Sequence, residues 1–155
     1  MADTMADTKV ATGLLSKGIT FSKGVVGTGN TITYSEVPGL MECPEMGGSA
    51  EKVEVTTLAD ASKRYINGVV DYGDMTFKFL YDNSAETSSY RVMNTLKGVN
   101  PFKVEFPDGT SFEFTGTPTT KVDSASVNGA LTFTVTIAPN SAITITNPTT
   151  TQSGT

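Results

Sequence analysis

The sequence contains no histidine, no tryptophan and a single cysteine, Cys43. Histidine is the commonest general base near neutral pH and the commonest metal ligand, so its absence argues against an enzyme or a metalloprotein. One cysteine cannot form an intramolecular disulfide or a cysteine cluster for zinc or iron–sulfur binding. Without a histidine to activate it, a buried or idle thiol is favoured over a nucleophile. We therefore expect no catalytic residue, no metal and no cofactor.

Long apolar runs and basic clusters are also missing. No run approaches the roughly 20 apolar residues of a membrane-spanning helix, and the start MADTMADTKV lacks the features of a secretory signal. We expect a protein made in a cytoplasm, with no membrane partner. Sixteen acidic and eleven basic residues give a net charge of -5, which opposes the phosphates of nucleic acids. Specific binding of DNA or RNA is therefore not expected.

What the chain does contain is alternation of apolar and polar residues, the period of a strand with one buried face. Gly24–Asn30 separates two alternating runs and predicts a hairpin turn, as does Asp108-Gly109 between two phenylalanine-rich runs. The alternating runs are 19–21, 31–34, 53–55, 75–79, 102–106, 112–114, 131–137 and 143–146. We predict a mainly β fold, an antiparallel β-sandwich or barrel.

One helix is predicted at about residues 86–97, where Tyr90, Met93 and Leu96 share one side, and it would flank the sheet. The 155 residues suit one domain, placed at 18–146 between a flexible N-terminal arm, 1–17, and a flexible C-terminal tail, 147–155. Residues 36–52, rich in glycine and proline, predict a long loop.

Threonines occupy the polar positions of the late strands, at Thr132, Thr134 and Thr136. A solvated strand face usually mixes lysine and glutamate, which also discourage pairing with other chains. Threonine favours β structure in any case, which is one interpretation. The other is that these strands contact strands of neighbouring subunits.

Residues 53–79 carry a family resemblance. They read as a strand, a polar turn and a second strand, with Val53-Glu-Val-Thr-Thr57 followed by Lys63-Arg-Tyr-Ile-Asn-Gly68 and the acidic-glycine turn Asp71-Tyr-Gly-Asp74. This order resembles the tail tube proteins (major tail proteins) of bacteriophages with long, noncontractile tails. From about Ile19 to Ile145 the order of elements is similar to that family as well.

The resemblance implies a structural subunit of a virion. Its hexameric rings would stack into a tube on a tape-measure protein, between a tail tip and a terminator, and DNA would pass through the lumen without specific binding. By the same resemblance, the loop 36–52 would reach the next ring through Leu40, Met41 and Met46, and Glu105 and Glu113 would face the lumen. A contractile or type VI-like tube shares the fold. A β-sandwich decoration or adhesion module is the alternative from another class.

Overall fold

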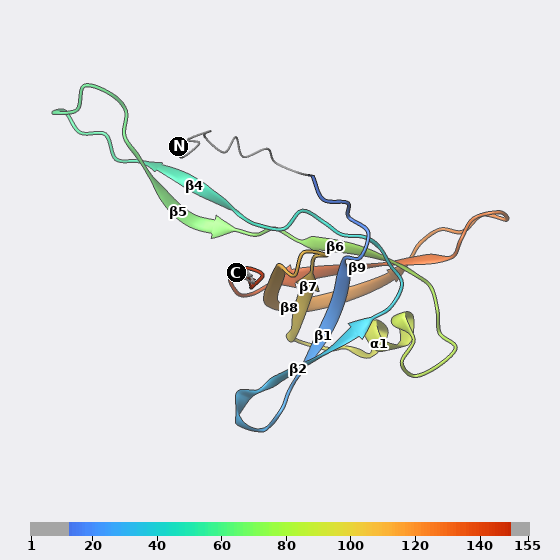
Figure 1. Ribbon diagram of the computed structural model, residues 1–155. Coiled ribbons are helices and arrows are strands. Elements are labelled where there is room, and N and C mark those ends of the chain that lie inside the picture. The colour runs from blue at the N-terminus through green and yellow to red at the C-terminus, as the bar shows by residue number, and fades with distance from the viewer. Residues whose placement is uncertain (1–12, 150–155) are drawn as a thin grey trace, which may run out of the picture.

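A computed structural model describes residues 13–149 of the chain (Figure 1). The predictions for residues 1–12 and 150–155 lie outside this range. The helical elements are a short 3-10 turn (Thr28–Asn30) and α1 (Ser89–Thr95). The strands are β1 (Thr20–Val26), β2 (Ile32–Val37), β3 (Leu40–Glu42), β4 (Ser49–Glu54), β5 (Tyr65–Asp71), β6 (Met75–Leu80), β7 (Asn100–Glu105), β8 (Ser111–Val122), β9 (Thr132–Pro139) and β10 (Thr144–Thr146).

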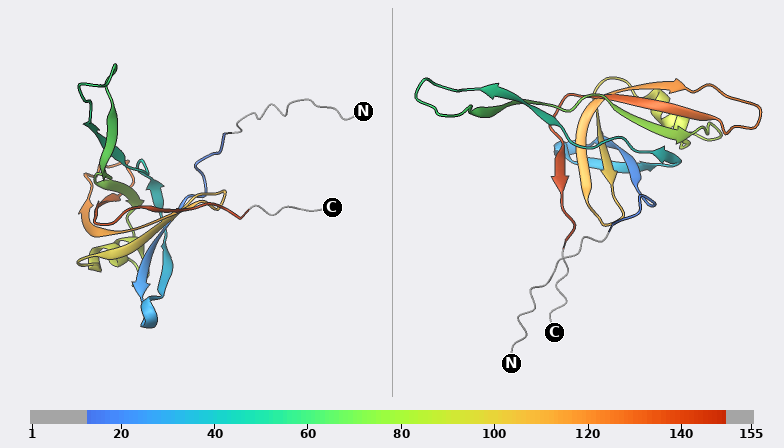
Figure 2. Two further views of the ribbon diagram at one scale, coloured as in Figure 1. Left: turned by 90° about the vertical axis from the view of Figure 1, so that its left-hand side faces the viewer. Right: turned by 90° about the horizontal axis from the view of Figure 1, so that it is seen from above.

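Most strands belong to one antiparallel sheet in the order β2-β1-β7-β8-β9-β6-β3, with β10 added beside β8. The twelve-residue β8 pairs with β7 over Ser111–Gly116 and with β9 over Gly116–Val122. It thereby joins a first half-sheet (β2, β1, β7 and the start of β8) to a second half-sheet (the end of β8, β9, β6 and β3). Figure 2 shows both halves from two further sides. The predicted mainly β, antiparallel fold is confirmed.

The core lies between the two half-sheets and consists chiefly of phenylalanine. Phe21 of β1 contacts Phe77 and Phe79 of β6, with ring centroids 4.6 Å and 5.4 Å apart. Such tilted and edge-to-face pairs contribute about 0.5–1.5 kcal/mol beyond the burial of their area. The buried apolar residues are Phe21, Val37, Met75, Phe77, Phe79, Met93, Phe102, Val104, Phe114, Phe133, Val135 and Ile137. Apart from Val37 and Met93, they are apolar members of the alternating runs.

The helix α1 packs on the second half-sheet, as the Tyr90 ring lies 5.4 Å from that of Phe133 and Met93 is buried. It is shorter than the predicted 86–97. Before it, Asp82 accepts hydrogen bonds from Ser84, and Ser88 accepts one from the backbone of Ala85. These side-chain bonds hold a turn where the helix was expected to begin, since serine and aspartate compete with helical hydrogen bonds.

Both predicted hairpins are present. β1 and β2 pair without interruption from Phe21–Val37 to Val26–Ile32, so the turn is shorter than Gly24–Asn30. Between β7 and β8, the Phe106 N–H donates to the Thr110 carbonyl and Gly109 has a φ of 97°. Glycine adopts that angle without the steric cost that a side chain adds.

Two segments differ from the prediction. The expected long loop 36–52 holds the end of β2, all of β3 and the start of β4. In residues 53–79 the expected polar turn contains another strand, β5, which pairs with β4. The sequence Tyr65–Asp71 was missed because Val69 and Val70 are consecutive and break the alternation. Residues 49–71 thus form a separate β4–β5 hairpin, which we call the arm.

The arm projects away from the body of the molecule, as Figures 1 and 2 show from three sides. None of its residues is buried, although it carries six large apolar side chains with substantial exposure: Val53, Leu58, Tyr65, Ile66, Val69 and Val70. A two-stranded hairpin is at best marginally stable alone in water. The arm therefore exposes apolar surface that the other described residues of the subunit do not cover.

Candidate assembly surfaces

The outer side of the first half-sheet carries a row of charged residues across its strands. Residues paired in an antiparallel ladder share a face. Ser22 of β1 pairs with Glu36 of β2 on one side and Lys103 of β7 on the other, and Lys103 pairs with Glu113 of β8. We call the surface formed by Tyr34, Glu36, Lys103, Glu105 and Glu113 the acidic face.

Lys103 lies at the centre of the acidic face. Its Nζ is 3.9 Å from Glu105 Oε2 and 5.5 Å from the centroid of the Tyr34 ring. Burial, and then the charge of Glu113, raises the pKa of Tyr34. Alternation along β2 places Tyr34 on the same side of the sheet as Glu36. Three carboxylates and one ammonium give -3 + 1 = -2 at neutral pH. The prediction of Glu105 and Glu113 omitted Lys103, although alternation from Glu105 places it on the same side.

The outer side of the second half-sheet carries the predicted threonines. Thr132 and Thr134 donate to the Asp123 carboxylate, at 2.8 Å and 2.7 Å between the oxygens. The hydrogen bonds from Thr134 and then Thr132 lower the pKa of Asp123, and the charges of Lys78 and Lys121 add to this effect. The hydroxyl groups of these two threonines are therefore used within the subunit.

The neighbours of the threonines also change the predicted character of this face. Lys78 of β6 and Lys121 of β8 both pair with Thr134, so the expected uncharged surface is flanked by two ammonium groups. β9 is hydrogen-bonded to β8 and to β6, which uses both of its edges. Contact with a neighbouring subunit through Thr132, Thr134 and Thr136 stays a prediction, and Thr132 is itself buried within the subunit.

The predicted inter-ring residues do not form one exposed surface. Leu40 pairs with Phe79, and both Leu40 and Met46 pack against the hydrophobic core. Met41 alone of the three is exposed. The sequence alone does not distinguish Leu40 and Met46, which pack on the core, from exposed Met41. The burial of isolated apolar residues in a glycine-rich segment depends on long-range contacts.

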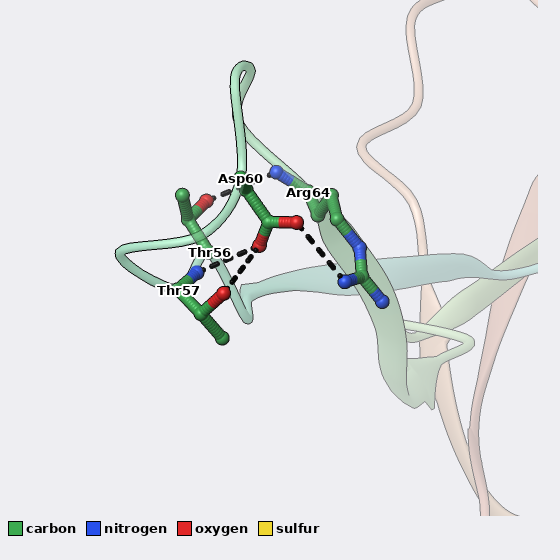
Figure 3. A network of polar contacts seen from close by, with 4 residues as sticks. All are labelled: Thr56, Thr57, Asp60 and Arg64. Carbon is green, nitrogen blue, oxygen red and sulfur yellow. Dashed lines mark hydrogen bonds and ion pairs between the residues drawn. The ribbon is translucent and has the colours of Figure 1, made fainter.

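The tip of the arm is held by a network around Asp60, shown in Figure 3. The Asp60 carboxylate accepts the Thr57 N–H at 2.8 Å and the Thr57 hydroxyl at 3.0 Å, and Arg64 Nη1 lies 3.3 Å from its other oxygen. The Arg64 N–H donates to the Thr56 hydroxyl at 3.0 Å. The hydrogen bonds that the Asp60 carboxylate accepts lower its pKa, chiefly the bond from the Thr57 N–H. The loop is thereby ordered although it has no apolar core.

We also searched the described part of the chain for a metal site, a reactive thiol and a membrane-spanning helix. Residues 13–149 contain no group of three histidine, cysteine, aspartate or glutamate side chains that could hold a metal ion. Burial raises the pKa of the Cys43 thiol, which disfavours the reactive thiolate. No helix within these residues has the length and apolar character to cross a membrane.

Several solved structures share the fold. The tail of an empty gene transfer agent particle with C6 symmetry is 20% identical, with 86% of this chain and 99% of that chain covered and a TM-score of 0.64. The sheath/tube terminator structure of an extracellular contractile injection system is 10% identical, with 89% and 99% covered and a TM-score of 0.67. The tube-terminating cap of the anti-feeding prophage is 14% identical, with 95% and 99% covered and a TM-score of 0.66.

No curated protein matches the chain. At the level of sequence families, the model of the phage tail tube protein (TTP) matches residues 4–148, which is nearly the whole chain. This agrees with the resemblance carried by residues 53–79 and with the antiparallel fold. The chain belongs to the phage tail tube protein family.

Proposed function

We propose that six copies of this tail tube subunit form a ring and that the rings stack into a hollow tube in a virion or virion-like particle. Sixfold symmetry is supported by the gene transfer agent tail, which has C6 symmetry and a similar subunit fold. The resemblance of residues 53–79 favours a long noncontractile tail. A contractile tube is the second candidate, because similar folds occur in contractile injection systems.

The observation that carries the proposal is the arm. Six exposed apolar side chains on a hairpin outside the body need a covering surface, and in a stacked tube a neighbouring subunit supplies one. The arm, rather than the whole segment 36–52, then reaches the next ring. Met41 remains a candidate for the same contact because it is exposed.

The acidic face is proposed to line the lumen, with Glu105 and Glu113 toward the DNA. Six copies of the chain carry 6 × -5 = -30 charges. A wall of like charge repels the phosphate backbone, so that the duplex slides without being held. Lys103 moderates this field, because it offsets one of the three carboxylates. The arrangement serves conduction and not binding.

The proposed partners are further copies of the chain, a tape-measure protein, a tail tip and a terminator. The similarity to a tube-terminating cap supports contact with a terminating component. Membership of the phage tail tube protein family suggests a structural role without catalysis.

Electron microscopy of the purified protein tests the proposal, because only a tube subunit forms rings or tubes of uniform diameter. The double variant Leu58→Ser and Val69→Ser should keep the native circular dichroism and form rings that do not stack into long tubes. Its matched control is Val99→Ser, an exposed valine outside the arm. A wild-type protein that stays monomeric at high concentration, with tape-measure and tail-tip proteins added, would contradict the proposal.

A further inference from the structure

The sequence contains two asparagine–glycine steps, Asn67-Gly68 and Asn128-Gly129. The side-chain carboxamide of an asparagine is open to attack by the backbone nitrogen of the next residue. Glycine shields that nitrogen least, because it has no side chain and adopts a wide range of backbone angles. The attack also requires the carboxamide carbon to approach the nitrogen, so the local backbone must be free to turn. The two steps differ in that freedom.

The first step lies within the β4–β5 ladder. Asn67 pairs with Lys52, as one of five residue pairs between the two strands. A side chain on an extended strand stands roughly perpendicular to the sheet, away from the next backbone nitrogen. Gly68 is also crowded, since a Cβ there would lie 3.1 Å from the Glu51 carbonyl oxygen. Reaction at Asn67 therefore requires local opening of the ladder.

The second step lies in the loop that joins β8 to β9. The last residue pair of these strands is Val122–Phe133, and beyond it the Asp123 N–H donates to the Thr132 carbonyl. Residues 124–131 are all exposed, and this loop lies at the end of the molecule opposite the arm (Figures 1 and 2). Asn128 is therefore open to water and outside the β8–β9 ladder.

A backbone hydrogen bond closes the turn that contains Asn128. The Gly129 N–H donates to the Ser126 carbonyl at 3.1 Å. Breaking one exposed hydrogen bond costs far less than separating a ladder of five pairs. The turn also requires its glycine, because a Cβ on Gly129 would lie 2.7 Å from the Ser126 hydroxyl oxygen. The local fold thus keeps an unshielded backbone nitrogen next to Asn128.

We propose that Asn128 is a site of spontaneous deamidation. The Gly129 nitrogen, after loss of its proton to hydroxide, attacks the carbon of the Asn128 carboxamide. A carbon–nitrogen bond forms to Gly129, and the bond to the side-chain nitrogen breaks, so that ammonia leaves with a proton from water. Water then opens the cyclic imide at one of its two carbonyl carbons. One opening gives aspartate, and the other gives isoaspartate. The reaction needs no oxidant, reductant or enzyme.

Conversion changes the tip of the β8–β9 loop in two ways. Each event replaces a neutral carboxamide with a carboxylate, which takes the net charge of the chain to -5 - 1 = -6. The isoaspartate product also adds a methylene group to the backbone of the turn. Val127, the preceding residue, is fully exposed, and a carboxylate beside it disfavours burial of this tip against a partner. The reaction requires no ring or tube, so it proceeds in the free subunit.

Incubation of the purified full chain at mildly alkaline pH tests the proposal. Lys121 is the last basic residue, so trypsin places Asn128 in the fragment 122–155 and Asn67 in the fragment 65–78. Tandem mass spectrometry should show conversion at Asn128 several-fold faster than at Asn67. An isoaspartate methyltransferase with labelled S-adenosylmethionine should label the fragment that contains Asn128. In the chain unfolded in urea, the two asparagines should convert at similar rates, since glycine follows both.

Two matched variants identify the acidic species that should accumulate in the wild type on ion exchange. Glutamine must form a larger ring and reacts more slowly, so Asn128→Gln should lose this species, whereas Asn67→Gln should keep it. Asn128→Asp marks the position at which the aspartate product elutes. An unconverted Asn128, or equal rates at both asparagines in the folded protein, would overturn the proposal. The same excess of conversion at Asn128 in urea as in the folded chain would overturn the role of the turn and the ladder.

Discussion

Lys103 and Glu113 are paired across the β7–β8 ladder, on the side of the sheet that faces away from the core. Glu105 also lies on that side, within 3.9 Å of the Lys103 ammonium. The acidic face thus contains one lysine, Lys103, which lies beside both Glu105 and Glu113. Its charge can be changed without disturbing the core, because Val104 and Phe114 point to the opposite side.

The double variant Glu105→Lys and Glu113→Lys should leave assembly intact and make the tube retain DNA. In a ring of six it shifts the net charge by 6 × 2 × 2 = +24, counted from these two positions. Duplex DNA should then co-sediment with the tubes at low salt and be released at high salt, since the Debye length falls from about 30 Å at 0.01 M to about 3 Å at 1 M. Subunit stability should change by no more than about 1 kcal/mol.

The matched control is Glu105→Gln and Glu113→Gln, which removes the repulsion without adding a positive charge. It should show little retention of DNA. If the lysine variant forms tubes that release DNA equally at both salt concentrations, these side chains do not face the lumen.

A second prediction separates Leu40 from Met41. Leu40→Ala should destabilise the isolated subunit by about 2 kcal/mol in denaturant unfolding, because Leu40 packs against the core. Met41→Ala should change the same free energy of unfolding by less than about 0.5 kcal/mol, because Met41 is exposed. Met41→Ala is the variant that should weaken ring stacking. Equal destabilisation by both changes would show that Met41 is also a core residue.

The sequence predicted those parts of the fold whose signals are local. The Asp108-Gly109 turn and the alternating phenylalanines of β1, β6, β7 and β8 specify hairpins and a buried face by themselves. Glu105 and Glu113 were placed on the non-core side for the same reason. Whether that side forms a lumen depends on other subunits, which alternation within one chain does not describe.

Features that depend on long-range contacts were missed. The hydroxyl groups of Thr132 and Thr134 are engaged by Asp123, which the β8–β9 hairpin brings back beside them. Within the arm, the run 53–55 was predicted as a strand, whereas β5 escaped prediction because Val69 and Val70 break the alternation. In the proposed assembly its exposed valines and isoleucine face a neighbouring subunit, whose surface the sequence of one chain does not describe.

The last prediction concerns the pH dependence of the arm tip. The pKa of Asp60 is lowered in the folded protein because its ionised carboxylate accepts hydrogen bonds from Thr57 and Arg64. A lowered pKa means that this contribution to the order of the loop is present above the ordinary aspartate value and is lost as the pH falls through the lowered value. In dilute, unassembled protein the amide signal of Thr57 should therefore titrate below the ordinary aspartate pKa of about 3.9. Asp60→Asn should abolish this titration, whereas Asp108→Asn, which alters a similar turn in the body, should preserve it. A Thr57 signal that titrates at or above the ordinary value would mean that the Asp60 network does not hold the tip in solution.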